Sequence, residues 1–379
     1  MIKFLLKSIT CLFSFTILVN PVLSFSQTKD TIGTKALLAK IPETIKFSGY
    51  VDAYYAYSSD SVGINKFQKF PNVSPKNNQF GINIFQLSAQ YTAEKVRATA
   101  TIHYGDLPSG AWSPEYNIIQ EANAGFRLTK KLWIDAGFFK THIGTELLLP
   151  RDNITSSVSV ITYYEPWWQA GVRLTFTPND KLLITLHVLN GYNTFIENNK
   201  SKSYGLGVSY ALGEKGNINY YNLIGDDTPD GVETKHLRFL NNVVFNYEFT
   251  KKFKTTIGVD YISQQHSSLG DGTQSAAVYS AILTLKYQLK PRFAIYARGE
   301  TFSDKDGFLT GVITDASNKQ TGYVANGATL GAEFKPAENA YLRVEARDLM
   351  MENNQKIFHT DGANTNGRIE AMVHLGVWF

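Results

Sequence analysis

Apolar and polar residues alternate with a period of two through most of this chain. The clearest stretch is residues 95–105, in which Val96, Ile102 and Tyr104 share one parity and Arg97 and Thr101 share the other. Successive side chains of a β-strand point to opposite faces, so such a stretch predicts a strand with one apolar face. Similar stretches occupy residues 45–57, 171–177, 204–212, 242–249, 279–289 and 369–379. A strand is also predicted at residues 80–91, where a change of phase near Phe85 indicates a β-bulge.

The connections between these stretches alternate in length. Short polar turns lie near residues 92–94, 129–131, 178–180, 213–216, 250–252, 289–292 and 335–339. Longer loops lie at residues 58–79, 106–116, 141–166, 190–202, 226–235, 264–274, 303–322 and 351–366. The pattern predicts an all-β fold: one transmembrane antiparallel up-and-down β-barrel of about 16 strands (about 14 to 18), with short periplasmic turns and long extracellular loops. A soluble β-sandwich also alternates along its strands, but it requires no regular alternation of short and long connections.

The first residues have the features of a cleaved signal peptide. Lys3 and Lys7 precede an apolar stretch at residues 9–19, and small residues at Ser24 and Ser26 indicate a cleavage site. The expected organisation is a signal peptide at residues 1–26, a periplasmic lead-in at 27–44 and an outer-membrane barrel at 45–379. An N-terminal membrane anchor is the alternative, but the apolar stretch is too short to span a bilayer.

Composition narrows the class further. Aromatic residues make up 13% of the chain and charged residues 18%, a mix that favours strands and interfacial aromatic girdles. No apolar run of helix-spanning length follows the leader, which argues against a helical membrane protein. The formal net charge of +4 and the lack of a basic stripe give no indication of nucleic-acid binding. The single cysteine, Cys11, lies in the leader, so the mature chain is expected to contain no disulfide or cysteine-ligated metal.

The final stretch, residues 369–379, alternates up to a terminal aromatic residue, Phe379. A last strand that ends on phenylalanine resembles the insertion signal of outer-membrane barrels. The expected partners are therefore the barrel-assembly machinery, outer-membrane lipid and lipopolysaccharide.

Two stretches carry a family resemblance. Residues 47–57 (FSGYVDAYYAY) and 164–176 (YEPWWQAGVRLTF) resemble the β-barrel porin-2 family of outer-membrane porins, described as OmpL-like. The resemblance implies a porin-like barrel over the whole mature chain and carries over no catalytic residue. It does not determine the oligomeric state, for which a homotrimer is possible.

If the apolar parity faces lipid, the polar parity lines a lumen, and the barrel is wide enough for an aqueous channel. Charges of both signs on this wall would orient solutes and tune ion selectivity. The alternative is that they pair across neighbouring strands as structural salt bridges. The candidate lining residues are Lys46, Arg97, Arg127, Arg173, Arg238, Lys254, Lys286, Arg298, Arg343, Arg347 and Arg368, together with Asp52, His103, Glu121, Asp135, Glu248, Asp260, Glu300, Glu333, Glu345 and Glu370.

The longest loop, residues 141–166, has two interpretations. In the first interpretation, it folds into the lumen and narrows the channel, with Glu146, Arg151 and Asp152 facing arginines on the wall. Alternatively, residues 158–164 lengthen the sixth strand, and Pro166 breaks it.

The expected function is that of a porin, which gives passive diffusion of small hydrophilic solutes and ions, with no cofactor and no metal. One alternative is a surface binding or adhesion barrel with a blocked lumen. Another is an outer-membrane lipase that uses His103, His142 or His187 as its base, although Ser209 lies mid-strand in a poor nucleophile motif. Acidic loops at residues 226–231 and 304–307 suit solvated turns better than calcium sites.

Overall fold

The structure is a computed structural model, and it describes residues 45–70 and 73–379. The predicted signal peptide at residues 1–26 and the lead-in at 27–44 lie outside the described residues. Within the described part, no helix is long and apolar enough to cross a membrane.

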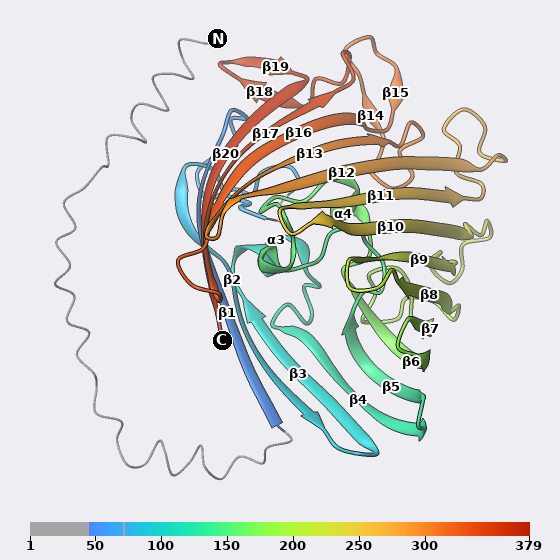
Figure 1. The fold of residues 1–379 in the computed structure, drawn as a ribbon. Helices are drawn as coiled ribbons and strands as arrows, with labels where there is room; N and C mark the ends of the chain where they lie inside the picture. The colour runs from blue at the N-terminus through green and yellow to red at the C-terminus, as the bar shows by residue number, and fades with distance from the viewer. Residues whose placement is uncertain (1–44, 71–72) are drawn as a thin grey trace. The chain divides into compact units, whose positions relative to one another are not determined.

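Sixteen antiparallel strands form one closed barrel, as the alternation predicted (Figure 1). Each strand pairs with its neighbours in sequence, apart from two small hairpins that stand outside the ring. The barrel strands are β1 (Ile45–Ser58), β2 (Gln79–Thr92), β3 (Val96–Tyr104), β4 (Ile119–Thr129), β5 (Leu132–Lys140), β6 (Trp168–Asn179), β7 (Leu182–Leu189), β8 (Ser203–Ala211), β9 (Gly216–Gly225), β10 (Arg238–Thr250), β11 (Phe253–Gln264), β12 (Ala276–Lys290), β13 (Phe293–Ser303), β16 (Val324–Phe334), β17 (Ala340–Met351) and β20 (Gly367–Trp378).

The two parities of each strand have opposite environments. On β3, Ile102 and Tyr104 are 46% and 69% exposed, whereas Thr101 and His103 are buried. A chain whose large apolar side chains point away from its own interior requires an apolar solvent outside, which a bilayer supplies. The predicted outward face of the strands is therefore confirmed.

The ring closes where the first strand meets the last. β1 pairs with β20 in antiparallel register, with Val51 opposite Val377. Beyond the end of β20, Phe379 exchanges two backbone hydrogen bonds of 3.1 Å with Gly49. A Cβ atom at Gly49 would lie 2.5 Å from the Phe379 ring, so this glycine makes room for the terminal aromatic side chain. Closure leaves no strand edge with unpaired backbone groups in the membrane.

The predicted bulge lies two residues from where it was expected. In the β1–β2 register, Asp52 pairs with Ile84 and Ala53 pairs with Ile82, so Asn83 is the extra residue instead of Phe85. The side-chain amide of Asn83 donates a 2.9 Å hydrogen bond to the Asp52 carboxylate. The bulge thus turns this amide into the interior.

Short turns and long loops alternate as predicted, and several long loops contain structure of their own. The second long loop contains α3 (Asp106–Ala111), and the last two contain the hairpins β14 (Ile313–Thr314) with β15 (Gln320–Thr321) and β18 (Phe358–Thr360) with β19 (Ala363–Thr365). The loop at residues 141–166 contains the 3-10 turn η1 (Pro150–Asp152) and the helix α4 (Val160–Tyr164).

The interpretation that residues 158–164 extend the sixth strand is wrong. β6 begins at Trp168, and α4 precedes it (Figure 1). Val160 and Ile161 of α4 are almost completely buried in an apolar cluster inside the barrel. This burial outweighs the local strand preference of β-branched residues.

The interior is less polar than the sequence suggested. Inward side chains close to the long loops form an apolar cluster with α4 and Phe70, and this cluster includes Leu189, Leu223, Leu240, Ile262, Val278, Phe302 and Leu349. These positions have the inward parity that was expected to carry polar groups. They are apolar because the folded loops cover them and exclude water, so they form a core.

Candidate functional site

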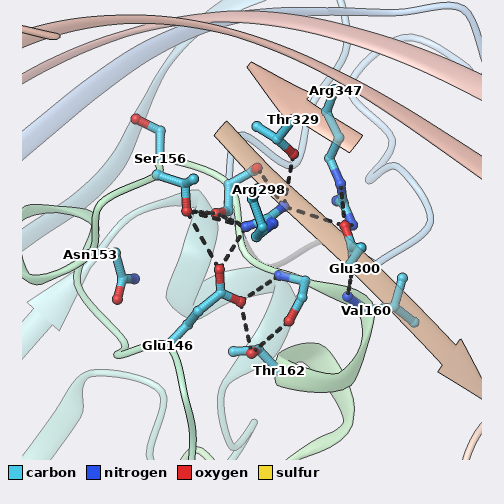
Figure 2. A network of polar contacts seen from close by, with 12 residues as sticks. Glu146, Asn153, Ser156, Val160, Thr162, Arg298, Glu300, Thr329 and Arg347 are labelled. Carbon is cyan, nitrogen blue, oxygen red and sulfur yellow. Dashed lines mark hydrogen bonds and ion pairs between the residues drawn. The ribbon is translucent and has the colours of Figure 1, made fainter. Parts of the chain in front are cut away.

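The loop at residues 141–166, which we name the constriction loop after the role expected from sequence, is anchored to the inner wall by a buried arginine. Arg298 on β13 donates hydrogen bonds of 2.7 Å to the Glu146 carboxylate and 2.6 Å to the Ser157 carbonyl (Figure 2). Its second terminal nitrogen lies 3.4 Å from Glu300 Oε1. The guanidinium therefore joins a loop carboxylate, a loop carbonyl and a wall carboxylate. Charge-assisted bonds of this kind are the strong ones.

A second arginine holds the tip of the same loop. Arg343 on β17 donates to the carbonyl oxygens of Pro150 at 2.7 Å and Asn153 at 2.9 Å. Its Nε donates to Glu333 on the neighbouring strand β16 at 2.9 Å. Backbone carbonyls of an irregular loop would otherwise be buried without donors, so this side chain permits the loop to lie in the lumen.

Wall carboxylates satisfy the loop's backbone N–H groups in turn. Glu345 accepts from the N–H of Ser156 at 2.7 Å and of Ser157 at 2.9 Å. Glu300 accepts from the N–H of Val160 at the start of α4, at 2.7 Å (Figure 2). The charges of β13 and β17 thus serve as anchors for one loop as well as cross-strand partners, and Glu333 of β16 supports the anchor Arg343.

The three loop residues singled out from sequence occupy different places. Glu146 faces a wall arginine, Arg298, as expected. Asp152 lies 3.6 Å from its neighbour Arg151, and the Arg151 guanidinium lies 5.0 Å from the centre of the Tyr50 ring. The turn η1 directs these two side chains to each other and Arg151 to the β1 wall, so Asp152 pairs within the loop instead of with the wall arginine that was expected.

Other candidate lining residues also pair, many across the strands. On β3 and β5, Arg97 donates to Asp135 at 2.6 Å, and Arg173 of β6 lies 3.4 Å from the same carboxylate. Four further pairs are Lys286 with Glu333 at 2.5 Å, Arg347 with Glu300 at 2.7 Å, Arg368 with Glu370 at 3.2 Å and Lys254 with Glu248 at 2.8 Å. Salt bridges therefore occur along much of the wall, but of these pairs only Arg173–Asp135 and Lys254–Glu248 join neighbouring strands, as the alternative expected. The others reach across an intervening strand or, for Arg368 and Glu370, lie on one strand.

The remaining candidates have other contacts. Glu121 lies 3.4 Å from Lys140, Arg127 donates to the Glu94 carbonyl at 3.3 Å, Arg238 lies over the Tyr192 ring at 4.7 Å, His103 lies 3.1 Å from the Gln120 amide, Asp260 accepts from Asn242 at 2.6 Å, and Lys46 is exposed.

Two cavities lie against the constriction loop. One, of about 470 Å³, lies among the long loops and is lined by Trp112, Tyr163, Tyr164, Trp167 and Tyr192. We call it the outer cavity. The other, of about 400 Å³, lies between the loop and the wall of β8 to β12, and we call it the inner cavity.

The wall of the inner cavity is built from neutral polar side chains that the sequence analysis missed. Asn219 donates to Asn217 at 2.8 Å, Asn246 donates to the same oxygen at 3.1 Å, and Thr256 donates to Asn246 at 2.7 Å. We call these four residues the amide ladder. They occupy the inward parity of β9, β10 and β11, which could have identified them had amides been considered beside charges.

A buried carboxyl group, Glu165, was also missed. It lines a further cavity of about 130 Å³ beside the constriction loop. Within the described part of the chain, neither of its oxygens nor Oδ2 of Asp260 has a hydrogen-bond donor. Burial, reinforced by the Asp260 carboxylate, raises the pKa of Glu165 well above its ordinary value.

Three residues at the barrel seam, Ser74, His374 and Asp52, contact one another in the same order as the catalytic triad of a serine hydrolase. Ser74 Oγ lies 2.5 Å from His374 Nε2, and His374 Nδ1 lies 2.8 Å from the Asp52 carboxylate. Ser74 is only 2% exposed, its N–H donates to Asn83 at 3.4 Å, and the next residue is Pro75, which has no N–H. Neither the bonded N–H of Ser74 nor Pro75 can therefore serve as the oxyanion donor that acyl transfer requires.

The bases suggested for a lipase lie elsewhere. His142 is held between Gln169 at 3.0 Å and the Asn222 carbonyl at 2.9 Å, and His187 lies 3.0 Å from Thr185. His103 contacts Gln120, and none of the three bonds to a serine in the described ranges.

The acidic loops form turns. Asp304 accepts hydrogen bonds from the N–H groups of Gly307, Leu309 and Thr310, at 2.9 to 3.0 Å. Asp226 accepts similarly from the N–H of Thr228 at 2.9 Å. Among residues 45–70 and 73–379, no cluster of three or more metal-ligating side chains occurs.

Solved structures with a similar fold are outer-membrane channels. An anion-selective porin from Comamonas acidovorans matches with a TM-score of 0.60 at 9% identity, over 88% of this chain and 99% of that one. The channel DcaP of Acinetobacter baumannii matches with a TM-score of 0.60 at 11% identity, over 88% and 97%. The trimer form of OmpT of Vibrio cholerae matches with a TM-score of 0.57 at 10% identity, over 89% and 99%.

These likenesses are too distant in sequence to show more than the fold. A search of curated proteins found no significant match. A family profile described as "Putative beta-barrel porin-2, OmpL-like" matches residues 44–379, which is almost the whole chain. The predicted resemblance is thereby confirmed, and the chain belongs to this family of outer-membrane β-barrel porins.

Proposed function

We propose that the barrel is a passive pore for small hydrophilic solutes, narrowed by the constriction loop. The observation that supports this most directly is the inner cavity, which lies between the loop and the β8 to β12 wall. A closed barrel of this size leaves room for water inside, and the loop occupies only part of that room. Solutes would pass from the outer cavity, beside the loop, to the amide ladder.

The constriction role of the loop is part of this proposal. Glu146 ties the loop to Arg298 at 2.7 Å, and Glu345 and Glu300 hold its backbone. With so many fixed points, the loop would narrow the passage permanently and would not act as a mobile lid. Pore lining by the wall charges that remain partly exposed, such as Arg97 and Arg173, is proposed as well.

A second candidate function is a barrel with a closed lumen that acts through its outer loops. The apolar cluster of Phe70, Val160, Ile161 and the wall residues beside the long loops favours it, because ions do not cross a dry apolar constriction easily.

Conductance and solute flux separate the two functions. The purified protein is inserted into planar bilayers in KCl and, separately, into liposomes for swelling in a neutral monosaccharide. The pore predicts discrete conductance steps and swelling above empty liposomes. If neither appears although the protein is folded and inserted, the closed barrel is the correct reading.

We also propose export by a cleaved signal peptide at residues 1–26, contact with lipopolysaccharide and a homotrimeric assembly. Recognition of the last strand by the barrel-assembly machinery is another. It is supported by the position of Phe379 at the seam.

We further propose that the barrel has no catalytic activity. The buried Ser74, with no oxyanion donor beside it, fits a structural link between the first long loop and the seam. Covalent labelling of Ser74 by a fluorophosphonate probe would contradict this.

A further inference from the structure

The barrel side of the inner cavity carries no ionised group among the residues that the structure describes. It is lined by amides, hydroxyls, one aromatic ring and one aliphatic side chain: Ser209, Asn217, Asn219, Tyr221, Val244, Asn246, Thr256 and Thr284. An amide offers two donors and an acceptor, and a hydroxyl offers both roles. This wall therefore presents donors and acceptors side by side without a fixed charge.

The loop side of the same cavity holds two carboxylates, and each has a cation beside it. Glu146 is bonded to Arg298 at 2.7 Å, and Asp152 lies 3.6 Å from Arg151. Neither carboxylate is left to attract a cation alone. Both faces of the inner cavity are thus close to electrically neutral.

The outer cavity has an aromatic lining and also includes a cation, Arg238, whose guanidinium lies 4.7 Å from the centre of the Tyr192 ring. Its aromatic residues include Trp167, whose ring N–H donates to the Thr162 carbonyl at 2.6 Å, and Tyr192, whose hydroxyl donates to the Tyr164 carbonyl at 2.6 Å. These bonds hold the rings in place, so they form a pre-ordered platform. The C–H face of a ring-shaped solute packs on such aromatic surface, while its hydroxyls reach water.

We propose that the pore prefers uncharged polyhydroxylated ring solutes, that is, saccharides, to ionised solutes of the same size. This inference rests on the proposed pore function and names its substrate class. The aromatic platform would collect the solute, and the amide ladder would exchange hydrogen bonds with its hydroxyls during passage.

The physical reason is a difference in desolvation. An ion that leaves water for the inner cavity, whose barrel wall carries no ionised group among the described residues, loses hydration that neutral dipoles replace poorly. A sugar hydroxyl loses hydrogen bonds to water and regains them from amides at little net cost. The balanced wall charges do not change this, because many are bound to one another or to the loop.

Three matched rings test the preference. Tracer uptake of glucose, glucuronate and glucosamine is measured in proteoliposomes held at zero membrane potential, beside KCl conductance of the same preparation. We expect uptake of glucose to exceed that of either charged ring several-fold. If the protein conducts KCl but takes up a charged ring as fast as glucose or faster, the inference is wrong and the proposed pore function still holds. Absence of conductance and of uptake overturns both.

A single substitution tests the wall itself. Asn217→Asp keeps the oxygen that accepts from Asn219 and Asn246, and it adds one negative charge to the ladder. We expect the glucose preference over glucosamine to be lost or reversed. Asn354→Asp adds the same charge at an exposed loop position and should leave the ratios unchanged. If Asn217→Asp, shown to be folded, also leaves them unchanged, the ladder is not the selective wall.

Discussion

Arg298 illustrates how one side chain can determine where a loop lies. It is 2% exposed, and its partners include Glu146, Ser157, Glu300 and Thr329, the last through a 3.2 Å hydrogen bond (Figure 2). A buried charge with this many partners is tolerable only as long as the set is complete. Its removal leaves the Glu146 carboxylate buried without a countercharge, whereas Glu300 keeps its pair with Arg347.

We therefore expect Arg298→Met to destabilise the protein by about 3–5 kcal/mol, the usual cost of breaking a buried pair. It should also raise single-channel conductance, because Glu146 loses its hold on the wall. Reversible urea unfolding in detergent, followed by tryptophan fluorescence, measures the first effect.

The matched control is Lys254→Met. Lys254 is 53% exposed where it pairs with Glu248, so its loss should cost less than about 1 kcal/mol and leave the conductance unchanged. Equal effects of the two variants would show that burial of the Arg298 pair has no special importance.

The inward parity of Arg298 could be predicted from sequence, but its loop partner could not. Alternation within β13 sets which way the side chain points. Glu146 lies 152 positions away in the chain, and no local pattern encodes that encounter. The same applies to Ser74 and His374, which are 300 positions apart.

At the scale of elements, the constriction loop approaches β11 at a glycine. A Cβ atom at Gly258 would collide with the side chain of Thr145 in the loop. Glycine is required here because of this close approach, and not because of an unusual backbone angle.

Gly258→Val should therefore push the loop away from β11. Valine suits a strand, so the barrel itself should still form. We expect conductance to rise several-fold, measured in single-channel recordings. Gly299→Val is the control, because a Cβ atom there meets no other atom within 4 Å. A conductance that stays at the wild-type level in Gly258→Val would contradict the packing of the loop on this strand.

The strands were predictable, whereas α4 was not. Alternation within the sequence indicates the lipid-facing side of the clearest strands, such as β3. The five residues of α4, VITYY, have high strand propensity, yet they form a helix. The reason is tertiary: Glu300 caps the Val160 N–H, and Ile161 packs in the interior cluster. These tertiary contacts outweigh the strand propensity of the segment, and they cannot be predicted from the local sequence because they form only when the barrel wall is assembled.

At the scale of the whole molecule, the seam between β1 and β20 completes the ring. Phe379 is 73% exposed to the surroundings of the barrel and stacks its ring over Gly49. An aromatic ring at this position both extends the girdle and covers the last pair of backbone bonds.

We expect Phe379→Ala to lower the yield of assembled barrel by a factor of several, measured as the heat-modifiable fraction in outer-membrane preparations. Phe334→Ala removes an exposed aromatic ring from the end of β16, away from the seam, and should have a smaller effect. Similar losses in both variants would indicate a general need for girdle aromatics.

The sequence was sufficient for the closed barrel, its strand number and its family. It was insufficient for the course of the passage, because that depends on where the constriction loop lies. The charges on β13, β16 and β17 looked like channel lining, and most of them are occupied in holding the loop.

The charged anchors and the amide ladder therefore occupy separate arcs of the ring: the arginines and carboxylates that hold the loop lie on β13 and β17, while the amide ladder lies on β9 to β11. Substitutions in the amide ladder can alter which molecules are admitted without removing a charged anchor of the loop. Exchange of a few asparagines, in evolution or by design, could thus change which solutes this pore admits and leave its architecture intact.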